Sequence, residues 1–136
     1  MAFLPLRGGF IQQSQNRYDF AHQTIDPFDG FSSVKINAAN TNYQHTEFAN
    51  NGVASTQWNN IATEARIELA HKELFGSKGI LGFQVTGSTL NATDLSTNSY
   101  AVVPQAKSNS SALFWVEEGR YGPMKTSLGA RYNYLT

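Results

Sequence analysis

The feature that most constrains the fold of this chain is a two-residue alternation of apolar and polar side chains. It is clearest from Ile61 to Lys72, where one set of alternate positions holds Ile61, Thr63, Ala65, Ile67 and Leu69, and the other holds Glu64, Arg66, Glu68 and Lys72. On a helix, Ile61, Ala65 and Leu69 would share a face that leaves Ile67 on the opposite side. A strand gathers all of these apolar residues on one face, so the pattern predicts a β-strand.

The same alternation recurs along most of the chain. Apolar residues at alternate positions are Val34, Ile36 and Ala38, then Leu81, Phe83 and Val85, then Met124, Leu128, Ala130, Tyr132 and Tyr134. A weaker strand is expected from Gln13 to Ile25. Between Ser111 and Glu118 the centre of the segment is apolar at successive positions, so the side that each residue faces stays open. The sequence therefore predicts an all-β fold, an antiparallel meander of about six strands.

The connections between these segments are expected to alternate in length. Three are compact and rich in turn residues: Asp26 to Gly30, Phe75 to Gly79, and Arg120 to Pro123. Two others, around Ala49 to Gln57 and Leu95 to Ser108, are longer and contain many Asn, Ser, Thr and Gly residues. Short turns at one end and long polar loops at the other are typical of outer-membrane barrels, in which the short turns are periplasmic.

The kinds of residue on the two faces favour a wall of a transmembrane β-barrel. The apolar positions are often small, as at Ala38, Ala65 and Ala130, which suits contact with lipid. Aromatic residues near the expected long-loop ends, where an interfacial girdle would lie, are Tyr43, Trp58, Tyr132 and Tyr134. The opposite positions carry full charges and are predicted to face the lumen: Lys35, Glu64, Arg66, Glu68, Lys125 and Arg131. A soluble β-sandwich would produce similar alternation and stays an alternative.

Composition narrows the classes of function. Charged residues make up 15% of the 136 residues, against about 25% in typical soluble domains. Ten acidic residues balance ten basic ones without clustering, so no nucleic-acid partner is expected. There is no cysteine, which removes disulfide frameworks and thiolate sites. No apolar run approaches the roughly 18 residues of a membrane helix, and the sequence of residues 1–7, MAFLPLR, is not that of a signal peptide.

Several short motifs, taken in order, resemble the middle barrel region of TonB-dependent receptors. They are Arg17-Tyr18-Asp19, Asp26-Pro27-Phe28, Asn42-Tyr43-Gln44-His45-Thr46-Glu47-Phe48, Glu64-Ala65-Arg66-Ile67-Glu68-Leu69 with His71, Gly79 to Gln84, Pro104, Ser111-Ala112-Leu113-Phe114 with Glu117-Glu118, and Gly129-Ala130-Arg131-Tyr132. The resemblance extends from about residue 13 to the end of the chain. It is nearest to the subgroup associated with uptake of zinc and haem.

This resemblance implies a place in the bacterial outer membrane and a role in transport. Such receptors have a 22-stranded barrel and an N-terminal plug that engages TonB, whereas residues 1–136 match only a partial barrel segment. The implied partners are outer-membrane lipid, the remainder of the barrel and the plug, with TonB reached only through the plug. No resident cofactor is implied, although zinc, haem or an iron chelate could be cargo. About six strands are too few to close a barrel, since even small barrels use about eight.

His45 and Glu47 are the candidate metal-contacting pair. At positions i and i+2 of a strand they share a face, the same polar face as Lys35 and Asn37. An imidazole and a carboxylate suit zinc, which would need further ligands from elsewhere. The alternative is that the two side chains only line a solvated wall. His22 and His71 are expected to carry no chemistry, and His71 falls on the lipid-facing positions near a periplasmic turn, as an interfacial aromatic residue.

The other candidate positions have both a functional and a structural interpretation. The alternating charges of Glu64, Arg66 and Glu68 could contact a plug or a passing substrate, but cross-strand ion pairing is the favoured interpretation. The segment from Asn98 to Ser110, with Tyr100, Val102, Val103 and Pro104, would be an extracellular loop able to touch ligand, phage or antibody.

No enzyme is expected from this sequence. It contains no ordered Ser/His/Asp set, no phosphate-binding glycine loop and no local metal motif. Besides a receptor segment, two other functions stay open. One is a small adhesin-like or structural outer-membrane β-protein that oligomerises, and the other is a soluble β-sandwich with a binding role.

Overall fold

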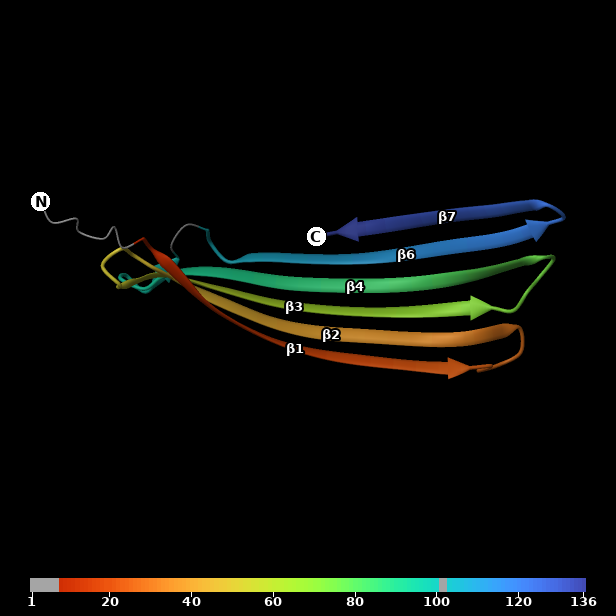
Figure 1. The fold of residues 1–136 in the computed structure, drawn as a ribbon, viewed down its shortest axis with the longest axis horizontal. Helices are drawn as coiled ribbons and strands as arrows, with labels where there is room; N and C mark the ends of the chain where they lie inside the picture. Colours follow the sequence, from red (N-terminus) through yellow and green to blue (C-terminus); the bar gives the residue numbers. More distant parts are fainter. Residues whose placement is uncertain (1–7, 101–102) are drawn as a thin grey trace, which may run out of the picture. The chain divides into compact units, whose positions relative to one another are not determined.

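A computed structural model describes residues 8–100 and 103–136 of the chain. These residues form strands joined by turns and loops, and all the strands belong to one sheet with the order β1-β2-β3-β4-β6-β7, with β5 paired to β4 (Figure 1). The strands are β1 (Phe10–Ile25), β2 (Phe31–Phe48), β3 (Ala54–His71), β4 (Ser77–Asp94), β5 (Ser99–Tyr100), β6 (Ala106–Tyr121) and β7 (Met124–Leu135). Apart from the step past β5, each strand lies beside its neighbour in sequence. The expected all-β antiparallel meander is confirmed.

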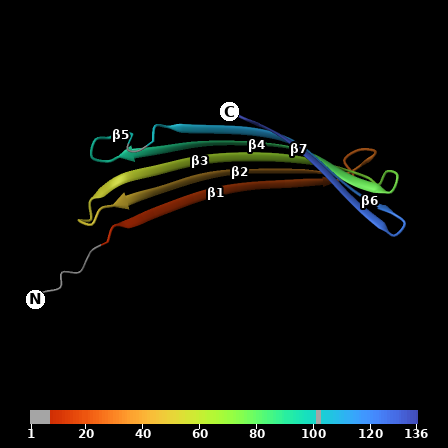
Figure 2. The same ribbon diagram turned by 90° about the horizontal axis from the view of Figure 1, so that it is seen from above.

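The strand count and one connection differ from the expectation. The seventh strand is the two-residue β5, which pairs antiparallel with the end of β4 through Thr93–Tyr100 and Asp94–Ser99 (Figure 2). The segment from Ala49 to Gln57 is not a long loop, because β3 already begins at Ala54. A tight turn closes this hairpin through the hydrogen bond from Gly52 N to Ala49 O, 2.8 Å, with Gly52 at a φ of 79°. Ser55, Thr56 and Gln57 therefore belong to a strand, although their polarity had suggested a loop.

The pairing of β6 with β7 resolves the facing of the segment whose centre is apolar throughout. Leu113 lies opposite Tyr132, and Trp115 lies opposite Ala130. Phe114, in contrast, lies opposite Arg131. Residues directly opposite each other in an antiparallel pair point to the same face of the sheet. Leu113 and Trp115 therefore belong to the apolar face, whereas Phe114 belongs to the face that carries the charges.

The sheet residues divide into two compact units. Unit 1 takes the described residues among 1–17, 41–62 and 88–107, and unit 2 takes 18–40, 63–87 and 108–136. Four of the long strands change character where they pass from one unit to the other. In unit 2 the alternate positions that include Ile67 and Leu81 are mostly apolar. In unit 1 the corresponding positions are mostly amides and hydroxyls: Gln12, Ser14 and Asn16 of β1; Asn42, Gln44 and Thr46 of β2; Ser55, Gln57 and Asn59 of β3; Thr89, Asn91 and Thr93 of β4. Phe10, Phe48 and Ile61 are the apolar exceptions.

The apolar rows of unit 2 are exposed. Leu113 is 51% exposed, Leu81 48% and Phe83 45%. Within the described residues the only buried apolar side chains are Ala39, Ala92, Ala112 and Phe114. A soluble two-layer sandwich would bury such rows against a second layer. No second layer covers them in the part of the chain that the structure describes. No helix among the described residues has the length and hydropathy needed to cross a membrane.

Candidate functional site

The charged face of unit 2 centres on one aromatic ring, that of Phe114. The guanidinium carbons of Arg66 and Arg131 lie 4.4 Å and 5.8 Å from its centroid. Phe114 itself is 8% exposed. Cations are attracted to the face of an aromatic ring by its quadrupole, at distances up to about 6 Å. Three strands thus contribute to one arrangement: Arg66 from β3, Phe114 from β6 and Arg131 from β7.

Neighbouring residues hold this arrangement in place. A side chain on Gly82 of β4 would overlap the Phe114 ring, so the absence of a Cβ there lets the ring lie across the strand. Arg131 donates from Nε to Asn133 Oδ1, 2.8 Å, and from an Nη to Gln84 Oε1, 3.3 Å. Arg66 forms an ion pair with Glu68 two residues along its own strand. Arg66 was expected to form an ion pair with a neighbouring strand. It instead pairs with Glu68 of its own strand and contacts the Phe114 ring, which reaches it across β4.

The remaining residues predicted to face the lumen are more dispersed. Lys35 and Glu64 are exposed positions of β2 and β3. Lys125 lies opposite Arg120 in the β6–β7 hairpin and lines a pocket of about 500 Å³ with Lys78, Glu118 and Ser127. The structure thus brings Arg66, Glu68 and Arg131 together and leaves Lys125 at the turn end of the same hairpin.

His45 and Glu47 lie together in unit 1, as expected. His45 Nε2 is 3.7 Å from Glu47 Oε1. The imidazole stacks on Trp58, with ring centroids 5.9 Å apart and an angle of 16° between the planes, and Tyr43 meets it at 5.6 Å. Tyr43 and Trp58 therefore share the face of His45, which is the predicted lumen face. They lie on the face opposite the apolar rows, which is not the face on which an aromatic girdle would contact lipid. In the described part of the chain no group of three or more His, Cys, Asp or Glu residues could hold a metal ion.

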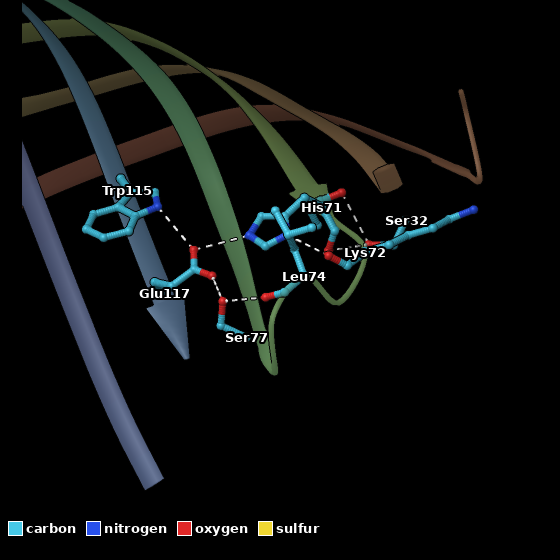
Figure 3. Close-up of polar contacts among 8 residues, drawn as sticks. Ser32, His71, Lys72, Leu74, Ser77, Trp115 and Glu117 are labelled. Carbon is cyan, nitrogen blue, oxygen red and sulfur yellow. Dashed lines mark hydrogen bonds and ion pairs between the residues drawn. The ribbon is translucent and has the colours of Figure 1, made fainter. Parts of the chain in front are cut away.

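A polar network of side chains lies at the turn end of unit 2, on the same face of the sheet as the apolar rows (Figure 3). His71 Nε2 is 3.1 Å from Glu117 Oε2, and Ser77 Oγ donates to Glu117 Oε1 at 2.5 Å. Trp115 Nε1 donates to Glu117 at 3.2 Å. His71 Nδ1 lies 2.6 Å from the carbonyl oxygen of Lys72. Strands β3, β4 and β6 are linked by this network, so His71 is a hydrogen-bonded residue rather than only an interfacial aromatic one.

The predicted ligand loop begins with a hairpin in unit 1 that Asp94 organises. Asp94 Oδ1 accepts hydrogen bonds from Ser96 N at 2.7 Å, Ser96 Oγ at 2.5 Å and Thr97 N at 3.2 Å. The Ser96 hydroxyl, followed by the amides of Ser96 and Thr97, lowers the pKa of Asp94 below its ordinary value. Tyr100 follows in β5 and is 58% exposed. Pro104 is exposed, and Val102 lies outside the described residues.

Two functional groups of residues escaped the sequence reasoning. Phe114 was ambiguous because its neighbours are apolar too, and only the β7 register assigns its face. Glu117 occupies an apolar-face position, and its partners are 46 and 40 residues distant in sequence. Spacing alone does not reveal such pairings, although Gly82, a glycine within an expected strand, was a usable signal of close approach.

No protein-family model matches this sequence. The structure therefore defines only the structural class of the protein. It is an antiparallel meander sheet that has one apolar and one charged face in unit 2.

Proposed function

We propose that this chain forms part of the wall of an outer-membrane β-barrel of the TonB-dependent receptor type, which takes up metal ions or metal chelates. The observation that carries the proposal is the exposed apolar face of unit 2. Its rows, such as Ile67 and Leu81, need an apolar environment, and lipid hydrocarbon supplies one without a second protein layer.

The lengths of the apolar segments agree with this environment. The apolar positions of β4 that belong to unit 2 lie between Ser77 and Gly87, and those of β7 between Met124 and Leu135. A tilted strand crosses the hydrocarbon with about 9–11 residues. The polar positions of β4 that belong to unit 1, such as Thr89, Asn91 and Thr93, then lie outside the hydrocarbon. That end also contains the longer connection with Tyr100 and Pro104, which suits extracellular ligand contact.

The proposal requires further strands. β1 and β7 are the outer strands of the sheet order, and the described residues include no pairing between them. Unpaired backbone groups in hydrocarbon cost several kcal/mol each, as an order of magnitude. The remainder of a barrel would pair with these two edges, and a plug domain inside it would meet the face that carries Arg66 and Arg131. TonB would be reached only through that plug.

The cargo in this proposal is a metal ion or metal chelate, with His45 and Glu47 as its contact on this segment. An imidazole and a carboxylate on one face are suitable ligands for zinc, and the other ligands would come from outside the described residues. Replacing both residues with Ala in the full-length receptor should lower zinc uptake. Unchanged uptake would remove this pair from the proposal.

The two tryptophans provide a direct test of the membrane assignment. Trp115 is on the apolar face of unit 2, whereas Trp58 stacks on His45 in unit 1. In bilayers with brominated acyl chains, the Trp58→Phe variant, which keeps Trp115, should show strong fluorescence quenching. The Trp115→Phe variant, which keeps Trp58, should show little. Equal quenching of both variants, or none in either, would contradict the proposed membrane orientation.

Extending the genomic reading frame in both directions tests the receptor type. A plug and the remaining strands beside this segment would support a receptor. Their absence, together with quenching of Trp115, would instead favour the oligomerising outer-membrane β-protein.

A further inference from the structure

A second pocket lies in unit 1, and its lining is polar but uncharged. It has a volume of about 600 Å³ and is lined mainly by amides and hydroxyls: Asn59, Asn91, Thr93, Asn98, Tyr100 and Gln105. Small-molecule pockets typically enclose about 300–1,000 Å³ and are mostly apolar. Among the described residues, its lining contains neither an aliphatic nor a fully charged side chain. Its occupant should therefore be neutral, polar and rich in hydrogen-bonding groups.

The strands and the hairpin build this pocket together. The antiparallel pair of Thr93 and Tyr100 joins β4 to β5. Asp94 fixes the turn between them through its hydrogen bonds to Ser96 and Thr97. Asn98 adopts a φ of 53°, a left-handed conformation that asparagine tolerates better than most residues. The hairpin thus holds the Asn98 and Tyr100 side of the pocket against the strand residues.

One polar atom in the lining lacks a partner. Asn91 Oδ1 is buried and has no hydrogen-bond partner among the described residues. Buried polar atoms nearly always have a partner, and an unmet one calls for a specific explanation such as a bound group.

We propose that this pocket binds a saccharide. Asparagine and glutamine amides each offer a donor and an acceptor on one planar group, which matches adjacent sugar hydroxyls. Tyr100 adds an exposed aromatic ring on which the apolar face of a pyranose can pack. The absence of full charges in the lining selects against phosphate or carboxylate groups as the recognised feature. The recognised chemistry is a neutral hexose or heptose unit.

Two sources could supply such a sugar: the core oligosaccharide of a glycolipid beside the protein, or a free oligosaccharide. The experiment uses the full chain folded in a dimethylamine oxide detergent, which has no sugar headgroup. Dephosphorylated lipopolysaccharide core oligosaccharide and maltoheptaose are titrated separately by calorimetry. If only the core oligosaccharide binds, the sugar is supplied by a glycolipid. If maltoheptaose binds, the pocket accepts a free oligosaccharide. Binding of neither overturns the proposal.

Variants connect the binding to this pocket. Tyr100→Ala should weaken binding at least tenfold, whereas Tyr100→Phe, which keeps the ring, should stay within about threefold of the parent. Asn59→Leu should also weaken binding at least tenfold. Asn16→Leu, an exposed strand amide of unit 1 outside the pocket, serves as the matched control and should leave the affinity unchanged.

The variant series is decisive because Tyr100 lies in an exposed two-residue strand, so its replacement does not endanger folding; circular dichroism checks this. Unchanged affinity in both Tyr100→Ala and Asn59→Leu would overturn the proposal. The inference is independent of the proposed receptor function. Saccharide binding without quenching of Trp115 by brominated lipid would uphold the pocket and reject the membrane wall.

Discussion

The imidazole of His71 and the carboxylate of Glu117 meet 3.1 Å apart over Gly79, a residue of the strand that separates them. A Cβ on Gly79 would overlap both side chains. The pair therefore links β3 to β6 across β4. The contact requires a residue without a side chain at position 79. Ser77 and Trp115 donate hydrogen bonds to the same carboxylate.

The contact between His71 and Glu117 should be measurable as a coupling free energy. In a double-mutant cycle of His71→Ala and Glu117→Gln, followed by urea unfolding in detergent, we expect a favourable coupling free energy that exceeds the error of the measurement. The two side chains are only 26% and 19% exposed, so solvent weakens the contact less than at an open surface. Additive effects of the two substitutions would contradict a direct interaction.

Gly79 and Gly82 of β4 should tolerate substitution poorly. Gly79→Ala would displace the His71–Glu117 pair, and Gly82→Ala would displace the Phe114 ring. Overpacking of this kind typically costs about 1–3 kcal/mol of unfolding free energy. Gly129→Ala is the control, since a Cβ there makes only ordinary contacts of 3.6 Å and 3.9 Å. Equal loss of stability in all three variants would mean that general strand propensity, not close approach, sets the cost.

The ring of Phe114 should couple unequally to its two arginines. Cation–π contacts at partly exposed sites contribute about 0.5–1 kcal/mol. Arg66 lies closer to the centroid than Arg131, 4.4 Å against 5.8 Å, so we expect the larger coupling to Arg66. Cycles that combine Phe114→Leu with Arg66→Gln or with Arg131→Gln measure the two values separately. A larger coupling to Arg131 would show that distance to the ring does not determine the order.

The turn at Asp94 should depend on pH. Its carboxylate has a pKa lowered chiefly by the Ser96 hydroxyl, and it lies in unit 1, outside the part proposed to cross the membrane. Because the folded pKa is below the unfolded one, the stabilisation is complete above the unfolded pKa of Asp94. It is lost as the pH falls through the lower, folded value. The amide proton shifts of Ser96 and Thr97 should report a midpoint below the ordinary aspartate range, and Asp94→Asn should abolish that titration.

Much of the fold could be predicted because strand alternation is a local signal. Ile61, Ile67 and Leu69 fall within one strand, and the turn at Gly30 joins β1 to β2 as expected. Boundaries were less accessible. Ser55 and Gln57 suggested a loop, because a strand portion with polar residues on both faces has the composition of a loop. In the structure these residues extend β3.

The candidate sites were predictable only where both partners lie on one strand. His45 and Glu47 share a face by simple spacing, and the structure keeps them together. Trp58 joins them from another strand, and Phe114 joins Arg66 with β4 between their strands. Those contacts depend on register, which a single sequence does not encode in any short motif.

Because Arg66 and Arg131 both lie against the ring of Phe114, the two guanidinium groups share one aromatic neighbour. Removing that ring therefore takes the aromatic contact away from both cations at once, and a shift of the ring changes the surroundings of both.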